Sequence, residues 1–154
     1  VFVSPTVDEW TLVVGYGLPD GDEHNGLRRI KKLVNQLSTT FGEAQYFASH
    51  RVVDYHVWIK SINGELIRVY GYIGESGVNI EVFGEPTPAE KPHKLINTLS
   101  EEAKADENYF EQEDLDYPDE QMVMEIAGAW SINPTLLDER TEITGLGMVG
   151  RMSK

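Results

Sequence analysis

The feature that most constrains the fold of this chain is the dipeptide Asn63-Gly64, which lies between two runs rich in β-branched and aromatic residues. Both residues tolerate the positive φ angles of a type I′ turn, so an Asn-Gly pair in this setting is a strong signal for a β-hairpin. Further turn signals at Ser76-Gly77 and at Gly84 divide the rest of residues 43–85. This region therefore predicts several antiparallel strands.

The position of the turn also predicts how the two hairpin strands pair. With Asn63 and Gly64 as the central turn residues, Ile62 faces Glu65, and counting away from the turn matches the remaining residues. The further expected pairs are Lys60 with Ile67, Trp58 with Val69, His56 with Gly71, and Asp54 with Ile73. Because successive side chains point to opposite faces of a strand, this pairing determines which side chains share a face.

Both faces of the predicted hairpin are largely apolar. One face carries Asp54, His56 and Trp58. The other face carries four candidate partner-binding residues: Tyr55, Arg68, Tyr70 and Tyr72. Tyrosine and arginine are enriched at the hot spots of protein interfaces, which makes this face a candidate binding surface. Tyrosines also commonly pack beneath a helix with their hydroxyl groups at the rim, and the sequence leaves both interpretations open.

Two main helices are predicted, one on each side of this strand-rich region. In residues 25–41 apolar side chains recur at a spacing of three to four, with Asn25 available as the N-cap and Gly42 beyond the end. In residues 118–130 an apolar face follows Pro118, which suits the first turn of a helix. Apolar faces of this kind pack against a sheet.

We therefore expect one α+β domain over residues 1–154, with an antiparallel sheet of about five strands packed against the two helices. A first strand is expected from Trp10 to about Gly17, where glycine and a turn cluster end it. The C-terminal residues 141–152 predict a final edge strand or a loose tail. No flexible linker or internal repeat indicates a second domain.

The net charge of −13 is concentrated in residues 101–120, which contain ten acidic residues and one lysine. The acidic residues are Glu101, Glu102, Asp106, Glu107, Glu111, Glu113, Asp114, Asp116, Asp119 and Glu120. A surface of this charge repels phosphate groups, so we expect no nucleic-acid binding there. It favours a basic protein partner, whose encounter it would accelerate. A solvated acidic loop that only aids solubility is the competing interpretation.

Four acidic residues near the end of this segment are the candidate partner contacts: Asp114, Asp116, Asp119 and Glu120. The cationic residues between Arg28 and Lys32 on the first predicted helix suggest a different function, in which the chain is a nucleic-acid-associated regulator. We expect these cations to face the acidic segment of the same chain or solvent instead.

The stretch SHRVVDYHVW, residues 49–58, brings His50, Asp54 and His56 close together in the sequence. Alternation along a strand would place all three on one face, and a carboxylate two residues from an imidazole can orient it as a general base. This supports an alternative function, a small hydrolase or ligand-binding regulator that uses His56 and Asp54. A concave pocket with both side chains open to solvent would favour that alternative, whereas finding both side chains buried and paired would contradict it.

Neither a metal nor a cofactor is expected. A zinc or iron site needs at least three protein ligands, and no spacing rule connects His24 or His93 with His56. The chain contains no cysteine, which excludes disulfides, iron–sulfur clusters and a thiol nucleophile. The balance of these observations favours a protein that is not an enzyme.

No apolar run approaches the roughly 20 residues that span a bilayer, so we expect no membrane partner. Residues 1–10 lack the basic start and apolar core of a secretory signal, and we expect a cytoplasmic protein. The sequence decides neither whether a leader precedes Val1 nor how many copies of the chain associate.

Two stretches resemble a group of uncharacterised single-domain acidic bacterial proteins: GEAQYFASHRVVDYHVWIKSINGELIRVYGYIGE, residues 42–75, and PDEQMVMEIAGAWSINPTLL, residues 118–137. In size and composition the chain is also similar to the immunity proteins that bacteria keep beside secreted toxins. This resemblance implies a non-enzymatic protein that neutralises or sequesters a basic protein partner, such as a cognate toxin. It supplies no catalytic residues.

Overall fold

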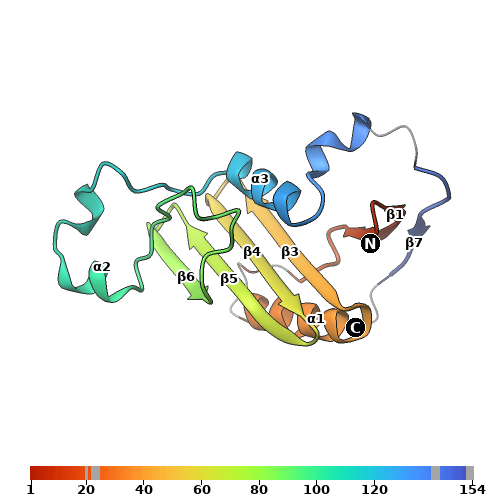
Figure 1. Ribbon diagram of the computed structural model, residues 1–154, viewed down its shortest axis with the longest axis horizontal. Helices are drawn as coiled ribbons and strands as arrows, with labels where there is room; N and C mark the ends of the chain where they lie inside the picture. The colour runs from red at the N-terminus through yellow and green to blue at the C-terminus, as the bar shows by residue number, and fades with distance from the viewer. Residues whose placement is uncertain (20, 22–24, 140–142, 152–154) are drawn as a thin grey trace.

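The computed structural model describes the chain except for residues 20, 22–24, 140–142 and 152–154 (Figure 1). The strands form two antiparallel sheets, with the orders β3-β4-β5-β6 and β2-β1-β7. The strands are β1 (Phe2–Val7), β2 (Trp10–Val14), β3 (Glu43–His50), β4 (Tyr55–Ile62), β5 (Glu65–Ile73), β6 (Val78–Phe83) and β7 (Met148–Val149). The helices are α1 (Gly26–Phe41), α2 (Glu101–Ala105) and α3 (Glu120–Trp130), with 3₁₀ helices η1 (Tyr109–Glu111) and η2 (Pro134–Glu139). The expected α+β class is confirmed, but the expected single sheet of about five strands is wrong.

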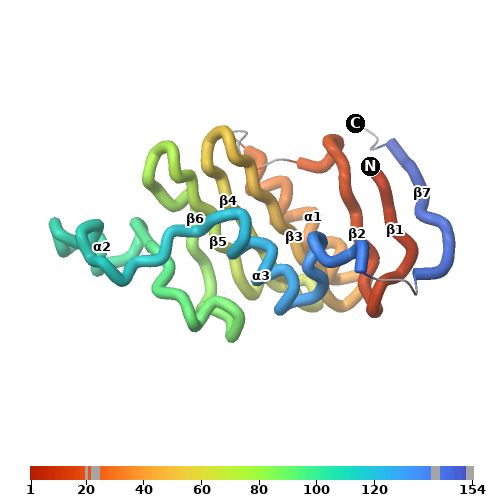
Figure 2. The backbone as a smooth tube through the Cα atoms, turned by 90° about the horizontal axis from the view of Figure 1, so that it is seen from above, coloured from red at the N-terminus to blue at the C-terminus, as the bar shows by residue number. Residues whose placement is uncertain are grey.

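Helices cover both faces of the four-stranded sheet (Figures 1 and 2). On one face, α1 packs Ile30 into a cluster that includes Val57 of β4. On the other face, α3 packs Ile126 into a cluster that includes Trp58 of the same strand. Because neighbouring residues of β4 point into different clusters, this strand is apolar on both sides.

The hairpin turn is confirmed, but the predicted register is correct only beside the turn. Asn63 and Gly64 have φ angles of 51° and 85°, and Ile62 pairs with Glu65. A bulge then shifts the pairing by one residue, because Ile67 is an extra residue on β5. Beyond it Trp58 pairs with Tyr70 instead of Val69, and the two rings stack with their centroids 4.4 Å apart. A shift of one residue exchanges the two faces of a strand.

The two main helices lie close to their predicted positions, and their ends differ from the prediction in detail. Asn25 is the residue before α1, although its side chain makes no capping hydrogen bond. The N-cap of α3 is Asp119, whose Oδ1 accepts a hydrogen bond from the backbone N–H of Met122 at 2.7 Å. Pro118 therefore precedes the helix, and its expected place in the first turn is wrong. No helix within the described residues is long and apolar enough to cross a membrane.

The three-stranded sheet lies at the end of the molecule opposite α2 (Figure 2). Its central strand β1 is not predicted from the sequence, because Pro5 and a register shift interrupt the pairing with β2. The strand β2 starts at Trp10 as expected but ends at Val14, since the chain turns at Gly15, where φ is 148°. The predicted C-terminal edge strand is present as the short strand β7.

Candidate functional site

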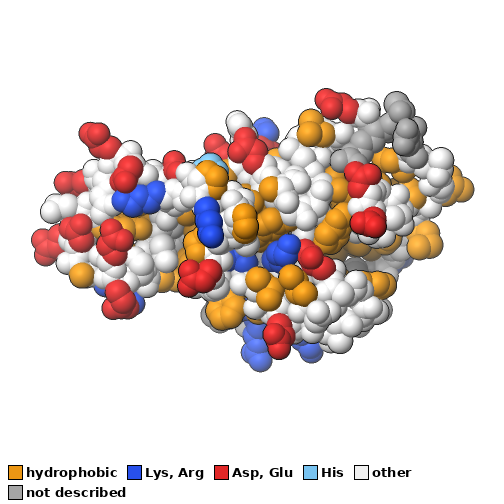
Figure 3. Space-filling model, viewed as in Figure 1, with side chains coloured by type: hydrophobic (Ala, Val, Ile, Leu, Met, Phe, Trp, Pro, Cys, Tyr) orange, Lys and Arg blue, Asp and Glu red, His pale blue; other side chains and the backbone are white. Residues whose placement is uncertain are grey.

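The acidic segment 101–120 forms a projection at one end of the molecule, built from α2, η1 and the loops around them (Figure 1). Acidic side chains gather on this projection in the space-filling view (Figure 3). The segment is anchored to the body through Tyr109, which is buried and whose hydroxyl oxygen accepts a hydrogen bond from the backbone N–H of Asn97 at 2.8 Å. A backbone bridge between Leu95 and Asp116 closes the loop. The acidic segment is therefore folded onto the body.

Each of the four predicted acidic contacts has a partner within the chain. Asp114 forms an ion pair with Lys94 at 2.9 Å, and this lysine holds the pKa of Asp114 below its usual range. Asp116 accepts a hydrogen bond from the backbone N–H of Lys94 at 3.0 Å. Asp119 caps α3, and Glu120 forms an ion pair with Arg51 at 2.6 Å. These four side chains therefore contribute to the fold as well as to the negative field.

Three other acidic side chains, Glu107, Glu111 and Glu113, are exposed and have no cationic partner among the described residues. Phe110 lies among them in the sequence, and 52% of its surface is exposed. Its ring meets the buried ring of Tyr109 edge-on, with the centroids 5.3 Å apart. We call Glu107, Phe110, Glu111 and Glu113 the η1 surface. The sequence analysis does not single out these residues, although an exposed aromatic residue within a charge run is a detectable signal.

The predicted tyrosine-rich binding face is wrong. Tyr55, Arg68, Tyr70 and Tyr72 are all buried, with exposed fractions of 1–3%. The bulge places Tyr55 on the α1 side of the sheet and the other three on the α3 side, so they do not form one surface. Burial raises the pKa values of Tyr70 and Tyr72, which keeps both rings neutral. These residues are part of the core.

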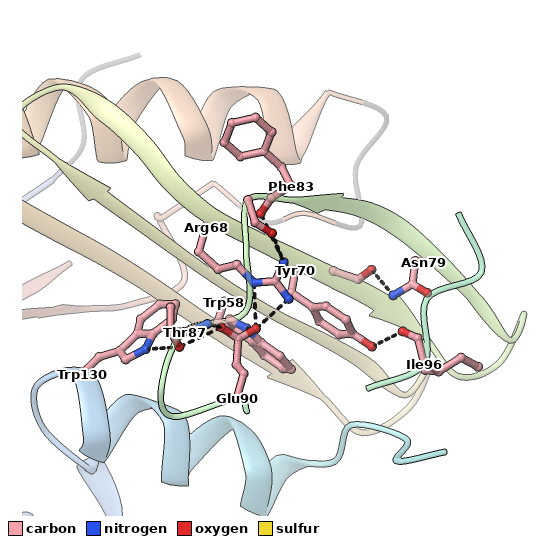
Figure 4. Close-up of polar contacts among 11 residues, drawn as sticks. Trp58, Arg68, Tyr70, Asn79, Phe83, Thr87, Glu90, Ile96 and Trp130 are labelled. Carbon is pink, nitrogen blue, oxygen red and sulfur yellow. Dashed lines mark hydrogen bonds and ion pairs between the residues drawn. The ribbon is translucent and has the colours of Figure 1, made fainter. Parts of the chain in front are cut away.

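Arg68 belongs to a buried ionic cluster on the α3 side of the sheet (Figure 4). Its Nε and Nη2 atoms donate to Oε1 of Glu90 at 2.8 and 2.7 Å, and Nη1 donates to the Gly84 carbonyl oxygen at 2.7 Å. Trp58 donates from Nε1 to the same Glu90 oxygen at 2.9 Å. A buried ion pair whose remaining hydrogen-bonding groups are satisfied costs little, but removal of one partner leaves an uncompensated charge.

Glu90 is fully buried, and the sequence analysis misses it. Its second carboxylate oxygen accepts hydrogen bonds from the backbone N–H and the hydroxyl of Thr87, both at 2.8 Å. Thr87 also accepts a hydrogen bond from the Trp130 ring nitrogen at 3.0 Å, which connects the cluster to α3 (Figure 4). The spacing of Thr87 and Glu90 matches the Thr-x-x-Glu pattern of a capping box, and this is the signal that identifies the pair.

The alternative site at His56 is closed. Its ring is 2% exposed, Nε2 lies 2.8 Å from Asp54 Oδ1, and Nδ1 lies 3.1 Å from Ser49 Oγ. A chain of serine, histidine and carboxylate can in principle activate the hydroxyl group. Here both ring nitrogens are occupied and the ring is buried, which leaves no room for a substrate beside it. His56 is buried and paired, but the side chain of its partner Asp54 is 59% exposed, so the criterion of two buried side chains is met by the histidine alone.

His50 does not share a face with His56, so the expected grouping of three side chains is wrong. His50 ends β3 and pairs with Tyr55, whereas Ser49 pairs with His56. The turn between β3 and β4 separates the two histidines, and alternation cannot be counted through a turn. Asp54 remains beside His56 because its backbone adopts a φ of 51° at the start of β4.

Two surface hollows lie on other parts of the molecule. One has a volume of about 400 Å³ and is lined by Arg68, Tyr70, His93 and Lys94 among others. The second has a volume of about 570 Å³ and is lined mainly by apolar atoms, including those of Ile67 and Trp130. His56 lines neither hollow. Within the described residues no group of three or more potential ligands could hold a metal ion.

Comparisons with known proteins give no relative for this fold and surface. No protein-family model, curated protein or solved structure matches the chain. The charges, contacts and exposure of its own residues are therefore the basis for its function.

Proposed function

We propose that the protein is a non-enzymatic binding protein that sequesters a basic protein partner through the η1 surface, in the manner of an immunity protein that occludes a toxin. The observation that carries the proposal is the presence of three exposed carboxylates without cationic partners in the sequence next to the exposed Phe110. Lysine and arginine side chains of a partner would neutralise these charges.

Charge and aromatic surface have separate roles in this proposal. The negative field of the projection accelerates encounter with a cationic protein, and the effect weakens as salt screens it. Phe110 supplies apolar area that leaves water on binding, which slows dissociation. The same residues have little to offer a nucleic acid, because its phosphate groups carry the same sign of charge.

The attachment of the projection to the body supports binding as well. Tyr109 is buried directly beside Phe110, so the exposed ring starts from an ordered position. The ion pair between Lys94 and Asp114 and the bridge at Leu95 hold the same segment from its other end. A surface that is ordered before binding loses less conformational entropy when the partner docks.

The experiment compares two triple variants of the full chain. In the first, Glu107, Glu111 and Glu113 are replaced by glutamine, and in the control the exposed residues Glu9, Glu65 and Glu75 are replaced in the same way. Both variants remove three negative charges from the net −13, so they differ only in where the charge is lost. Each triple variant is immobilised and used to capture basic proteins from the native host. The rate at which the purified partner associates with each variant is then measured.

We expect the first triple variant to lower the association rate about tenfold in low salt, while the control stays near the rate of the unchanged chain. Between about 10 and 150 mM salt the screening length falls from about 30 to 8 Å, so the rate of the unchanged chain should fall over that range. A partner that binds both variants equally, or an association rate that is insensitive to salt, would exclude the proposal.

A further inference from the structure

The three-stranded sheet lies at the end of the molecule opposite the acidic projection (Figures 1 and 2), and its only charged neighbours in the β1–β2 turn are Asp8 and Glu9. None of the strands β1, β2 and β7 contains a charged residue. Met148 and Val149 on β7 are 68% and 87% exposed, and Phe2 on β1 and Val14 on β2 are exposed too. Exposed apolar patches of this kind mark interaction sites on proteins.

The pairing of the strands arranges these side chains in rows on both faces of the sheet. Phe2 pairs with Val14 on one side and with Val149 on the other, which places all three in one row. Val3 pairs with Val13 and with Met148, which places a second row on the opposite face. Both rows end at β7, the outer strand of this sheet.

Within the part of the chain that the structure describes, no strand pairs with the outer edge of β7. Val1 and Gly150 exchange two hydrogen bonds of 2.9 Å, so the backbone groups of Gly150 face β1. Backbone groups alternate in direction along a strand, so those of Val149 and Gly147 face away from β1. No proline or charged residue lies between Ile143 and Gly150 to block this edge. Native sheets commonly protect such edges with these residues.

We propose that β7 is the contact at which two copies of this chain associate, by antiparallel pairing of the two β7 strands about a twofold axis. Met148 then lies opposite Met148 of the second copy, and Val149 exchanges hydrogen bonds with Gly147. The row of Val13, Val3 and Met148 continues across the axis into the second copy. The two three-stranded sheets become one sheet of six strands.

The distribution of charge makes this end the place where two copies of the chain repel each other least. Each chain carries a net charge of −13, so contact between copies through the acidic projection is opposed by repulsion. The uncharged strands lie at the opposite end, so pairing there keeps the two projections far apart (Figure 2). An antiparallel edge is also self-complementary, as an isologous twofold contact requires.

A single cysteine tests the register directly, because the chain has no cysteine of its own. Residues in a non-hydrogen-bonded antiparallel pair have Cα atoms about 4.5 Å apart, which lies within the range of a disulfide. Met148→Cys should therefore form a disulfide-linked dimer under mild oxidation. Val52→Cys, at an exposed position in the turn between β3 and β4, is the matched control and should cross-link much more slowly.

The mass of the unmodified chain in solution is the second measurement. We expect a species of twice the 17.4 kDa chain mass at high protein concentration. Met148→Lys places like charges opposite each other and should raise the dissociation constant of the dimer about tenfold or more, while Val52→Lys leaves it unchanged. A chain that stays monomeric overturns the proposal, and so does a dimer that Met148→Lys does not weaken. Equal cross-linking of the two cysteine variants overturns the pairing at β7.

Discussion

The buried pair of Arg68 and Glu90 and the exposed pair of Lys94 and Asp114 have the same chemistry in opposite surroundings. Arg68 and Glu90 are almost inaccessible to water and satisfy each other together with Trp58 and Thr87. Lys94 and Asp114 meet at a similar distance, but both side chains are in contact with solvent. We therefore expect the ion pair to be indispensable where water cannot replace a lost partner and dispensable where water can.

The largest effect is expected from Glu90→Gln. The substitution keeps the shape of the side chain but leaves the Arg68 guanidinium buried without its counter-charge. We expect a loss of about 3–5 kcal/mol in the free energy of unfolding, measured by urea denaturation. Glu85→Gln, an exposed position in the same loop, should leave the unfolding midpoint unchanged. A small effect for Glu90→Gln would mean that the buried pair is no more important than a surface pair.

The next largest effect on stability is expected from Gly84→Ala, a substitution that changes no charge but affects the same buried cluster. Gly84 has a φ of 76°, and a Cβ atom there would overlap the carbonyl oxygen of Ile67 in the bulge. We expect Gly84→Ala to cost about 1–3 kcal/mol by thermal or urea unfolding, because the carbonyl that accepts from Arg68 must move. Gly77→Ala has a similar φ of 68° and open space around it, so it measures the backbone cost alone. If the two variants lose the same free energy of unfolding, the surrounding structure relaxes enough to remove the overlap with the Ile67 carbonyl oxygen.

Asp119→Ala tests an exposed carboxylate that acts through a backbone hydrogen bond. Loss of the bond to Met122 N–H removes the N-cap of α3, and we expect a cost of about 1 kcal/mol in unfolding free energy. The exposed helix residue Gln121, replaced by alanine, is the control and should have almost no effect. A capping effect as small as that of the control would remove Asp119 from the residues that stabilise the fold.

The smallest effect is expected from Lys94→Ala. The lysine lowers the pKa of Asp114, so the pair contributes stability above the ordinary carboxyl pKa and loses it as pH falls through the lowered value. Both groups are exposed, so we expect no measurable change in the unfolding midpoint at neutral pH. The pKa of Asp114, followed by NMR titration, should rise when the lysine that lowers it is removed. An unfolding midpoint that falls clearly would contradict the contrast with the buried pair.

Local signals in the sequence predict the elements around the hairpin well. Asn63 and Gly64 form the turn, and the apolar spacing of residues 25–41 corresponds to α1. The register fails at Ile67, because the bulge there, which lies against Gly84, leaves no mark in the alternation of residues. One extra residue moved Arg68, Tyr70 and Tyr72 away from Tyr55, and with them the predicted binding face.

In the acidic segment, too, the sequence predicts one property and the tertiary fold decides another. Its charge is evident from the sequence, whereas its place at one end of the molecule is seen only in the structure. The pairing of individual carboxylates is not evident, because Asp114 meets Lys94 and Glu120 meets Arg51 only through the tertiary fold. Glu107, Glu111 and Glu113 are exposed and have no cationic partner within the part of the chain that the structure describes.

The sequence by itself determined the strand-rich centre, the two main helices and the concentration of negative charge, because turn chemistry, apolar spacing and composition act over a few neighbouring residues. Only the tertiary structure decided the division into two sheets, the burial of Arg68 with Glu90 and the closure of the site at His56. Those outcomes depend on which distant segments exclude water from one another, and Glu90 reaches Arg68 only when the loop that carries it packs against β5.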